Sequence, residues 1–406
     1  MNSKLKKTAQ FLGLNRSIGA MLIMVILLGM GEKMGERFLP IYLLAIGGSV
    51  YAVGFLNALD NFLSAIYSWI GGTVSDKVGY KKALMIYTGF SIFGYLIIIL
   101  FPSWQAVLIG AIFFISWTAL SLPAILSLVS STLKKEKQTM GVSMHSLIRR
   151  IPMAIGPLAG GILIQMYGIL TGARIAFAVA LIFALLSLVF IVVYIEDKQE
   201  KSIPVIHVID TLKQMPKPLK TLLFSDILIR FAEQIPYAFV VVWIMQTNQQ
   251  SAVNFSLLTM IEMAVAMLIY IPVAYLSEKI SNKVIVSITF GFFTIFPVIL
   301  LFSTGMPMLI LAFVIRGLKE FGEPTRKALI VKLAKEGSKA TTFGTYYLLR
   351  DIVVSMASLF SASLWLISPQ ANFLTASAFG LLGTLIFIAY GKDKRSSDEA
   401  SSLSNG

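Results

Sequence analysis

The stretch GGTVSDKVGYKK, from Gly71 to Lys82, places one acid and three lysines between two long apolar segments. Each of these segments is long enough to cross a lipid bilayer as a helix. A fainter copy, LSEKISNKV, returns at Leu276 to Val284, again between apolar segments. A short charged turn in this position is typical of two transmembrane helices that meet at the membrane surface. Its recurrence indicates that the chain contains a repeat.

The composition of the whole chain agrees with a helical membrane protein. Of its 406 residues, 57% are hydrophobic and 13% are charged, and the mean hydropathy is +0.81. A soluble domain carries about 25% charged residues. Strands of a membrane barrel would show alternation over about 10 residues, which the long apolar runs do not. The chain has no cysteine, and His145 and His207 are far apart in sequence, so we expect no metal and no other cofactor.

Apolar windows predict an all-α fold with twelve transmembrane helices in two pseudo-symmetric six-helix bundles. The spans are 17–45, 51–74, 82–102, 105–132, 139–168, 173–195, 219–246, 253–276, 284–303, 307–331, 341–367 and 371–390. The links are short except for a charged segment in the middle of the chain. We therefore expect an N-terminal bundle at 1–195, a cytoplasmic linker at 196–218, a C-terminal bundle at 219–391 and a disordered cytoplasmic tail at 392–406.

Basic residues lie almost entirely in alternate links. Lys77, Lys81 and Lys82 fall in one such link, whereas the opposite set of links contains only Arg174. By the positive-inside rule, both termini lie in the cytoplasm of a protein of the cell membrane. The net charge of +14 is then a topology signal, and nucleic-acid binding is not expected.

Several residues recur after a shift of about half the chain length. A shift of 202 residues brings Ser75-Asp76-Lys77-Val78 onto Ser277-Glu278-Lys279-Ile280, and Asp60 onto Glu262. A shift of 201 residues brings Pro123 onto Pro324 and Arg149 onto Arg350. Agreement at nearly one offset predicts an internal duplication, as in transporters whose two halves move about a central site.

Charged residues are distributed unevenly among the expected spans. The third, sixth, ninth and twelfth have essentially no charge in their interiors, whereas most of the others carry one or several. Each charge at mid-membrane costs roughly 2.5 to 3.5 kcal/mol. We therefore expect every third span to be an outer helix, and the charged spans to surround a hydrated interior.

The charged spans supply the candidate site residues. Asp60 and Glu262 lie deepest, without a basic residue within a helical turn on their own helices. A carboxyl group in a poorly hydrated cavity can bind and release a proton near neutral pH. The proton-coupling candidates are Asp60, Glu262, Glu32, Glu36 and Glu233. The candidates for the substrate cavity are Arg149, Arg150, Arg230, Arg316, Glu320, Glu323, Arg350 and Asp351, with Trp117, Trp243, Tyr237, Tyr346 and Tyr347 as aromatic candidates.

Structural interpretations of the same charges remain open. Arg316, Glu320 and Glu323 lie at i, i+4 and i+7 on one helical face, a spacing that suits a structural ion-pair ladder. Asp226, Arg326 and Lys327 lie near span ends, where an interfacial position is expected. The adjacent pairs Arg350–Asp351 and Arg149–Arg150 suit braces between helices as well as substrate contacts.

The segment from Gly72 to Leu84 resembles the loop motif between the second and third spans of the major facilitator superfamily. Gly72, Asp76, Lys77, Gly79 and Lys81 match the motif, whereas Tyr80 replaces its usual basic residue. The resemblance implies that this loop is a cytoplasmic latch, in which the acid at Asp76 pairs with the other bundle in the outward-facing state. Capping of a helix is the structural alternative for Asp76.

Two further motifs relate to coupling. GPLAGG, with Gly156, Pro157, Gly160 and Gly161, resembles the end of the family's antiporter motif, although Pro152 occupies its leading glycine position. Close helix packing explains the same small residues. GERF, at Gly35 to Phe38, resembles the first-span motif of the proton–peptide symporters, with its upstream acid shifted by one residue to Glu32.

The family resemblance implies a secondary transporter that moves a small solute by alternating access, coupled to protons. Export of drugs or toxic compounds by antiport and uptake of a nutrient or anion by symport both remain open. Arginines among the candidates make an anionic or zwitterionic substrate at least as plausible as a cation. No catalytic residue or nucleotide loop is present, so we do not expect an enzyme; a sensor without transport is a remote alternative. The expected partners are the solute, protons and the lipid bilayer, with the protein as a monomer.

Overall fold

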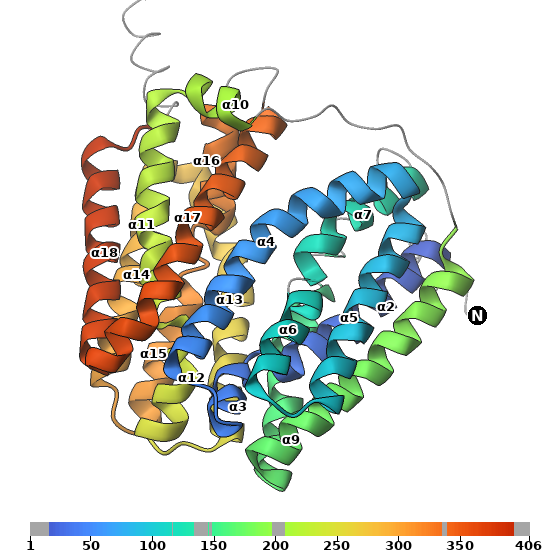
Figure 1. The fold of residues 1–406 in the computed structure, drawn as a ribbon. Coiled ribbons are helices and arrows are strands. Elements are labelled where there is room, and N and C mark those ends of the chain that lie inside the picture. Colours follow the sequence, from blue (N-terminus) through green and yellow to red (C-terminus); the bar gives the residue numbers. More distant parts are fainter. Residues whose placement is uncertain are drawn as a thin grey trace, which may run out of the picture. The chain divides into compact units, whose positions relative to one another are not determined.

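The computed structural model describes residues 16–115, 117–133, 145, 148–196, 208–334 and 339–393. Regular structure within these ranges is helical, and no strand occurs in them (Figure 1). The predicted all-α fold is therefore confirmed. The chain divides into two compact units. Unit 1 comprises Met1–Pro204 and Gln250–Met260, and unit 2 comprises Val205–Gln249 and Ile261–Gly406.

Unit 1 contains the first six expected spans. Its helices are α2 (Arg16–Glu36), α3 (Leu39–Ala45), α4 (Val50–Val78), α5 (Tyr80–Leu100), α6 (Trp104–Phe114), α7 (Trp117–Thr132) and α9 (Arg150–Tyr194), together with the first turns of α13 (Ala252–Lys279). Two spans are each built from two helices, α2 with α3 and α6 with α7. Long α9 holds the fifth and sixth spans, because the backbone leaves helical geometry at Gly168, where φ is 77°.

The charged stretch Gly71 to Lys82 forms the turn between α4 and α5. Gly79 has a φ of 85°, in the left-handed region that glycine adopts without steric cost. Its amide donates to Ser75 O at 2.9 Å, which closes the last turn of α4. The local backbone therefore explains why the motif has glycine at position 79, since a residue with a side chain would be strained at this φ.

Unit 2 contains the last six expected spans and part of the expected linker. Its helices are α10 (Val208–Gln214), α11 (Lys217–Tyr237), α12 (Phe239–Val242), a π-helical turn (Trp243–Thr247), the remainder of α13, α14 (Asn282–Phe302), α15 (Met306–Leu318), α16 (Glu323–Leu333), α17 (Lys339–Ile367) and α18 (Pro369–Tyr390). The tenth span is interrupted, because α15 ends at Leu318 and α16 starts at Glu323, with Pro324 in its first turn.

Nine helices in the described ranges are long and apolar enough to cross a membrane. One of them is α9, which turns at Gly168 and accounts for two expected spans. The two expected spans that are not among the nine correspond to α4 and to the interrupted pair α15–α16. Each of the twelve expected spans is thus built from one or two helices in the described residues, and the start of the fifth lies outside those residues.

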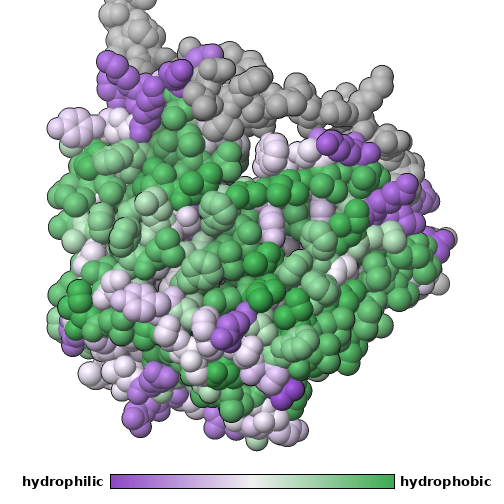
Figure 2. Space-filling view, viewed as in Figure 1, coloured by the Kyte–Doolittle hydropathy of each residue, from purple (hydrophilic) through white to green (hydrophobic). Residues whose placement is uncertain are grey.

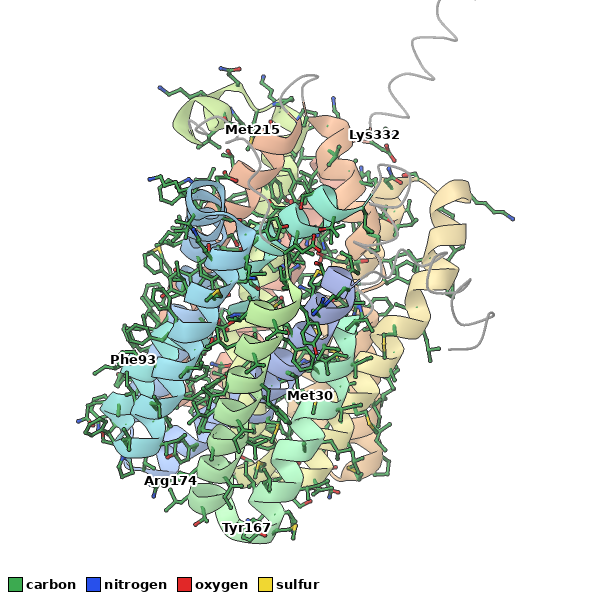
Figure 3. The ribbon with its side chains drawn as sticks, turned by 90° about the vertical axis from the view of Figure 1, so that its right-hand side faces the viewer. Met30, Phe93, Tyr167, Arg174, Met215 and Lys332 are labelled. Carbon is green, nitrogen blue, oxygen red and sulfur yellow. The ribbon has the colours of Figure 1, made fainter. Side chains whose placement is uncertain are left out.

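The helices expected on the outside carry large exposed apolar side chains. Ile86, Phe90 and Phe93 are exposed on α5, and Leu381 and Leu385 on α18. Figure 3 shows Phe93 pointing outward from unit 1. In Figure 2 the visible face over α18 is mostly apolar, with hydrophilic residues gathered at the end near α10. Such surfaces suit contact with lipid chains.

The segments that precede α11 and follow α18 lie at the end of unit 2 where cytoplasmic links are expected. Met215 and Lys332 lie at the same end of the unit (Figure 3). Asp393, just after α18, is 4% exposed; it accepts from the Asn282 amide at 2.8 Å and pairs with Lys332 at 2.9 Å. The rest of the expected tail, residues 394–406, lies outside the described residues, as do residues 197–207 of the expected linker.

Candidate functional site

Unit 1 holds a buried acid cluster made by Glu32, Lys33 and Glu36 of α2 and Thr118 of α7. Lys33 Nζ lies 3.0 Å from Glu32 Oε1 and also donates to Glu36 Oε2. Thr118 Oγ1 donates to the second oxygen of Glu32 at 3.2 Å. The side chain of Glu32 is only 4% exposed and that of Glu36 10%. Two buried carboxylates therefore share the same lysine, and we call this set the Glu32 cluster.

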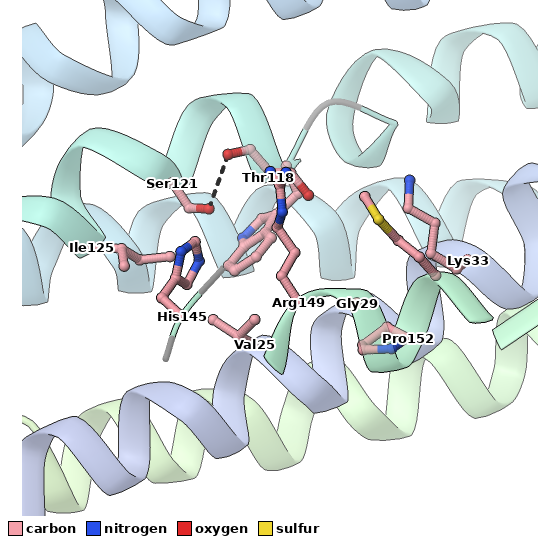
Figure 4. Close-up of a pocket in the computed structure, with 11 residues that line it drawn as sticks. Val25, Gly29, Lys33, Thr118, Ser121, Ile125, His145, Arg149 and Pro152 are labelled. Carbon is pink, nitrogen blue, oxygen red and sulfur yellow. Dashed lines mark hydrogen bonds between the residues drawn. The ribbon is translucent and has the colours of Figure 1, made fainter. Parts of the chain in front are cut away.

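A small pocket lies beside the Glu32 cluster (Figure 4). It contains about 350 Å³ of empty space, part of which is open to solvent. Its walls come from α2, α7 and the start of α9, with His145. The lining residues are Val25, Gly29, Lys33, Trp117, Thr118, Ser121, Ile125, His145, Arg149, Pro152 and Met153. We call it the unit 1 pocket.

Glycines of the GPLAGG motif bring α9 against the backbone that carries the Glu32 cluster. A Cβ at Gly160 would clash with Met34 O, and one at Gly156 would lie 2.7 Å from Lys33 Cβ. On the next face, a Cβ at Gly161 would clash with Ser256 Oγ, which donates to Pro157 O at 2.7 Å. The motif thus makes the close helix contacts that fix Lys33 beside the start of α9.

Unit 2 holds a second buried charge cluster around Glu262 of α13. Glu262 Oε1 lies 3.3 Å from Arg316 Nε and 3.7 Å from Lys319 Nζ. Lys319 also contacts Glu233 at 2.5 Å, and Glu233 in turn contacts Arg230 at 2.5 Å. The Glu262 side chain is 2% exposed and that of Arg316 3%. Glu262 has no basic neighbour on its own helix, yet α15 and the turn after it supply two.

Aromatic rings surround the cations of this second cluster. The Arg316 guanidinium carbon lies 5.3 Å from the ring centre of Phe296, 5.4 Å from that of Phe313 and 5.8 Å from that of Tyr237. Such cation–π contacts stabilise a desolvated cation by about 2 kcal/mol or more. A second small pocket is lined by Ala232, Glu233, Tyr237, Val240, Phe293, Phe296, Arg316 and Lys319.

A third buried cluster centres on Asp226 of α11. Its Oδ2 atom pairs with Arg326, accepts from Tyr346 Oη at 3.0 Å and lies 3.5 Å from Arg350 Nη1. Arg350 also binds the neighbouring Asp351 at 2.7 Å. Glu323 joins the second and third clusters, since it lies 2.6 Å from Arg326 and 3.4 Å from Arg230. The rings of Tyr346 and Tyr347 are 5.8 Å apart, and Arg350 lies 4.2 Å from the Tyr347 ring centre.

The interfacial position expected for Asp226 and Arg326 is wrong. Their side chains are 1% and 2% exposed, because helices α11, α16 and α17 enclose both. Lys327, by contrast, is 51% exposed. Counting residues from the span ends did not anticipate that an acid and a base from different helices would meet inside the bundle.

The expected ladder of Arg316, Glu320 and Glu323 on one helical face is also wrong. The helix ends at Leu318 and restarts at Glu323, so the three residues do not share a continuous face. Glu320 lies half-buried in the intervening turn. Arg316 and Glu323 instead contact other helices, as described above.

The other candidates are placed as follows. Asp60 is half-buried in the middle of α4, and Arg150 is half-buried at the start of α9. Asp351 is 26% exposed beside Arg350. Trp243 donates from its indole nitrogen to Leu300 O at 3.2 Å, which gives it a structural role in unit 2.

The residues of the expected latch lie at one end of unit 1. Gly72 and Asp76 are half-buried in the last turns of α4, and Lys77 is exposed. Among the described residues Asp76 forms no ion pair, and Gly79 makes the turn described above. Lys81 donates to Val192 O at 2.9 Å and so interacts with the carbonyl end of α9, where a cation is favoured.

The family model of the Major Facilitator Superfamily matches residues 17–228 and again residues 222–406. The chain therefore belongs to the major facilitator superfamily, a family of membrane transporters. An uncharacterized MFS-type transporter of Methanocaldococcus jannaschii is 23% identical over 370 residues, which cover 88% of this chain and 91% of that protein.

Solved structures show the same fold. The nucleoside transporter NupG superposes with a TM-score of 0.78 at 12% identity, over 93% of this chain and 100% of NupG. A POT family transporter in complex with a thioalcohol-conjugated peptide superposes with a TM-score of 0.77 at 14% identity, over 92% of this chain and 96% of that one. At such low identity the likeness concerns the fold.

Sequence reasoning passed over several residues that the clusters depend on. Lys33 and Lys319 lie within the first and tenth expected spans but are not among the candidate site residues. Thr118, Asp226 and Arg326 were not candidates either. A signal was present for Lys33, which is flanked by Glu32 and Glu36 on one helix. Thr118 and Lys319 meet their acids on other helices, so only the tertiary structure brings those groups together. Asp226 and Arg326 each have one partner on their own helix, Arg230 and Glu323, but meet each other only across helices.

Proposed function

We propose that this protein is a proton-coupled secondary transporter that moves a small solute by alternating access. Membership of a transporter family supports the general function, and three buried charge clusters support a hydrated, ion-handling interior. Charges of this kind in transmembrane helices commonly belong to substrate or proton pathways. The basic links support a cytoplasmic location of both termini in a cell membrane.

The observation that carries the proton coupling is the environment of Glu32. Glu233 and Glu262 each lie beside two cations, which stabilise their ionised forms. Glu32, in contrast, shares Lys33 with Glu36 and has a neutral hydroxyl as its other neighbour. Burial disfavours a charged carboxylate that is incompletely compensated. Among Glu32, Glu233 and Glu262, Glu32 is therefore the acid for which binding a proton costs least.

The coupling follows from the shared lysine. With Glu32 ionised, its carboxylate holds Lys33 on one side and Thr118 on the other. Once Glu32 is protonated, Lys33 interacts chiefly with Glu36, and the link from α2 to α7 through the charged oxygen weakens. A change in contacts between helices is what shifts an equilibrium between two conformations. If the solute and the proton bind the same conformation, the mechanism is symport. If they bind opposite conformations, it is antiport.

The test is transport by purified protein in liposomes with an imposed pH gradient and a panel of labelled solutes. We expect wild-type protein to accumulate its solute only with the gradient. Glu32→Gln preserves the shape of the side chain and should abolish gradient-driven accumulation while leaving solute exchange without a gradient. Glu196→Gln is the matched control, because Glu196 is exposed at the end of α9.

The outcomes separate the candidate acids. Accumulation by Glu32→Gln at the wild-type level would remove Glu32 from coupling. The corresponding amide variants, Asp60→Asn, Glu262→Gln, Glu36→Gln and Glu233→Gln, then identify the acid responsible. Flux that does not depend on the gradient in wild-type protein would contradict proton coupling altogether. The orientation of the gradient that drives uptake distinguishes symport from antiport.

A further inference from the structure

The polar atoms of the unit 1 pocket are arranged as hydrogen-bond donors. Lys33 and Arg149 contribute cations, and Trp117 contributes an indole N–H that cannot accept a hydrogen bond. The two hydroxyls in the wall direct their protons elsewhere: Thr118 donates to Glu32, and Ser121 donates to Thr118 O at 3.5 Å (Figure 4). Among the described residues that line the pocket there is no carboxylate, although Glu32 and Glu36 pair with its Lys33.

Trp117 is the observation that points to a ligand. Trp117 is 5% exposed, and its Nε1 atom is buried in the pocket wall with no hydrogen-bond partner among the residues that the structure describes. Leaving a buried donor unsatisfied costs about 1–3 kcal/mol, so such atoms usually have a function or a missing partner. An acceptor in the pocket would satisfy it.

Charge determines which acceptor fits. Figure 4 shows Arg149 reaching from the start of α9 toward Thr118, with Lys33 at one side of the pocket and His145 at the other beside Ile125. Arg149 and Lys33 would repel a cationic ligand at this wall. A carboxylate would form charge-assisted hydrogen bonds with them, in competition with Glu32 and Glu36 for Lys33. Apolar residues complete the wall: Val25, Ile125, Pro152 and Met153. These suit a short hydrocarbon chain.

We propose that the unit 1 pocket binds the anion of a small monocarboxylic acid, with its carboxylate between Lys33, Arg149 and the Trp117 indole. This inference names the solute class of the transporter proposed above and rests on that function. It also accounts for coupling, because Lys33 serves both the pocket and Glu32. A carboxylate in the pocket competes for the Lys33 ammonium, and Glu32 then takes up a proton from solvent. Anion and proton are thus bound together, and no net charge crosses with them.

Binding to detergent-purified protein tests the inference without any gradient. Butyrate is the probe, with butyramide as its uncharged counterpart and butylammonium as the cation, each followed by titration calorimetry. We expect butyrate alone to bind. Arg149→Gln should weaken binding about tenfold or more, since a charge-assisted hydrogen bond is lost. Trp117→Phe keeps the ring and removes only the N–H, and should weaken butyrate binding by a smaller factor.

Two control variants distinguish a loss of binding at the site from a loss of folding. Arg174→Gln changes an arginine just after the turn of α9 at Gly168, where its side chain donates to Ile99 O, and should bind butyrate like wild type. Arg149→Lys retains the cation and should recover part of the affinity. The inference is overturned if acetate, butyrate and hexanoate all fail to bind wild-type protein. It is overturned equally if butyramide binds as tightly as butyrate or if Arg149→Gln has no effect.

Proton uptake on binding separates this inference from the proposed coupling. Calorimetry in buffers of different ionisation enthalpy measures the protons taken up with butyrate. The titratable groups that face the pocket or its cluster are Glu32, Glu36, Lys33, Arg149 and His145. We expect Glu32→Gln to bind butyrate without proton uptake, and His145→Gln to retain the uptake. Binding with uptake that survives Glu32→Gln would leave the carboxylate site intact and refute the assignment of the proton to Glu32.

Discussion

Asp226 is the residue on which the buried arginines of unit 2 depend. It pairs with Arg326, lies 3.5 Å from Arg350 and 4.0 Å from Arg230 Nε, and accepts from Tyr346. Removing one member of a buried ion pair typically costs about 3–5 kcal/mol, because the remaining charge is left uncompensated. We therefore expect Asp226→Asn to lower the thermal unfolding midpoint of the detergent-purified protein markedly.

The matched control for this prediction is Lys327→Gln. Lys327 is 51% exposed and pairs with Glu323 at 3.3 Å, and an exposed pair contributes about 0–1 kcal/mol. Its midpoint should stay near that of wild type. Equal midpoints for Asp226→Asn and wild type would show that the Asp226 cluster does not stabilise unit 2.

At the same scale, sequence predicted which residues carry buried charge but not how they pair. Local order along one helix identifies Glu32 and Glu36 on either side of Lys33. It cannot identify Arg316 as a partner of Glu262, since that contact joins α15 to α13. Asp226 and Arg326 were misplaced for the same reason: distance from a span end was taken to imply exposure, whereas three helices enclose both residues.

At the scale of elements, close approach of α2 and α9 depends on Gly160. A Cβ there would clash with the backbone oxygen of Met34, next to Lys33. Overpacking of this kind costs about 1–3 kcal/mol when backbone must move. We expect Gly160→Ala to lower the unfolding midpoint and, by displacing α2, to reduce solute transport. Gly89→Ala on α5 is the control, because its Cβ meets nothing within 4 Å, and it should be neutral or slightly stabilising. Identical behaviour of the two variants would contradict the packing role.

The elements themselves were predictable because a bilayer imposes a length and an apolar composition on each span. The boundaries of α5, α14 and α18 follow the apolar windows closely. The windows did not predict the interruption between α15 and α16. Hydropathy averages over about 19 residues, and a turn of a few residues at Lys319 to Gly322 disappears in such an average.

At the scale of the whole molecule, the absence of cysteine from the sequence allows single-cysteine reporters. Gln105→Cys and Lys82→Cys sit at exposed positions on opposite sides of the expected topology. We expect a membrane-impermeant thiol reagent added to intact cells to label the first, and to label the second only after permeabilisation. The reverse pattern would invert the proposed orientation.

A third single-cysteine reporter, Ser121→Cys, tests the latch expected at Asp76. Asp76 carries the acid of the motif, which by the family resemblance pairs with the other bundle in the outward-facing state. Asp76→Asn removes that charge and should shift the population toward the inward-facing state. Ser121→Cys, in the unit 1 pocket, should then react faster with reagent from the cytoplasmic side. Lys77→Gln, at an exposed position one residue further along, tests whether any charge change in this turn has the same effect. If neither variant alters Ser121→Cys labelling, the turn at Gly79 joins α4 to α5 and does not control access to the pocket.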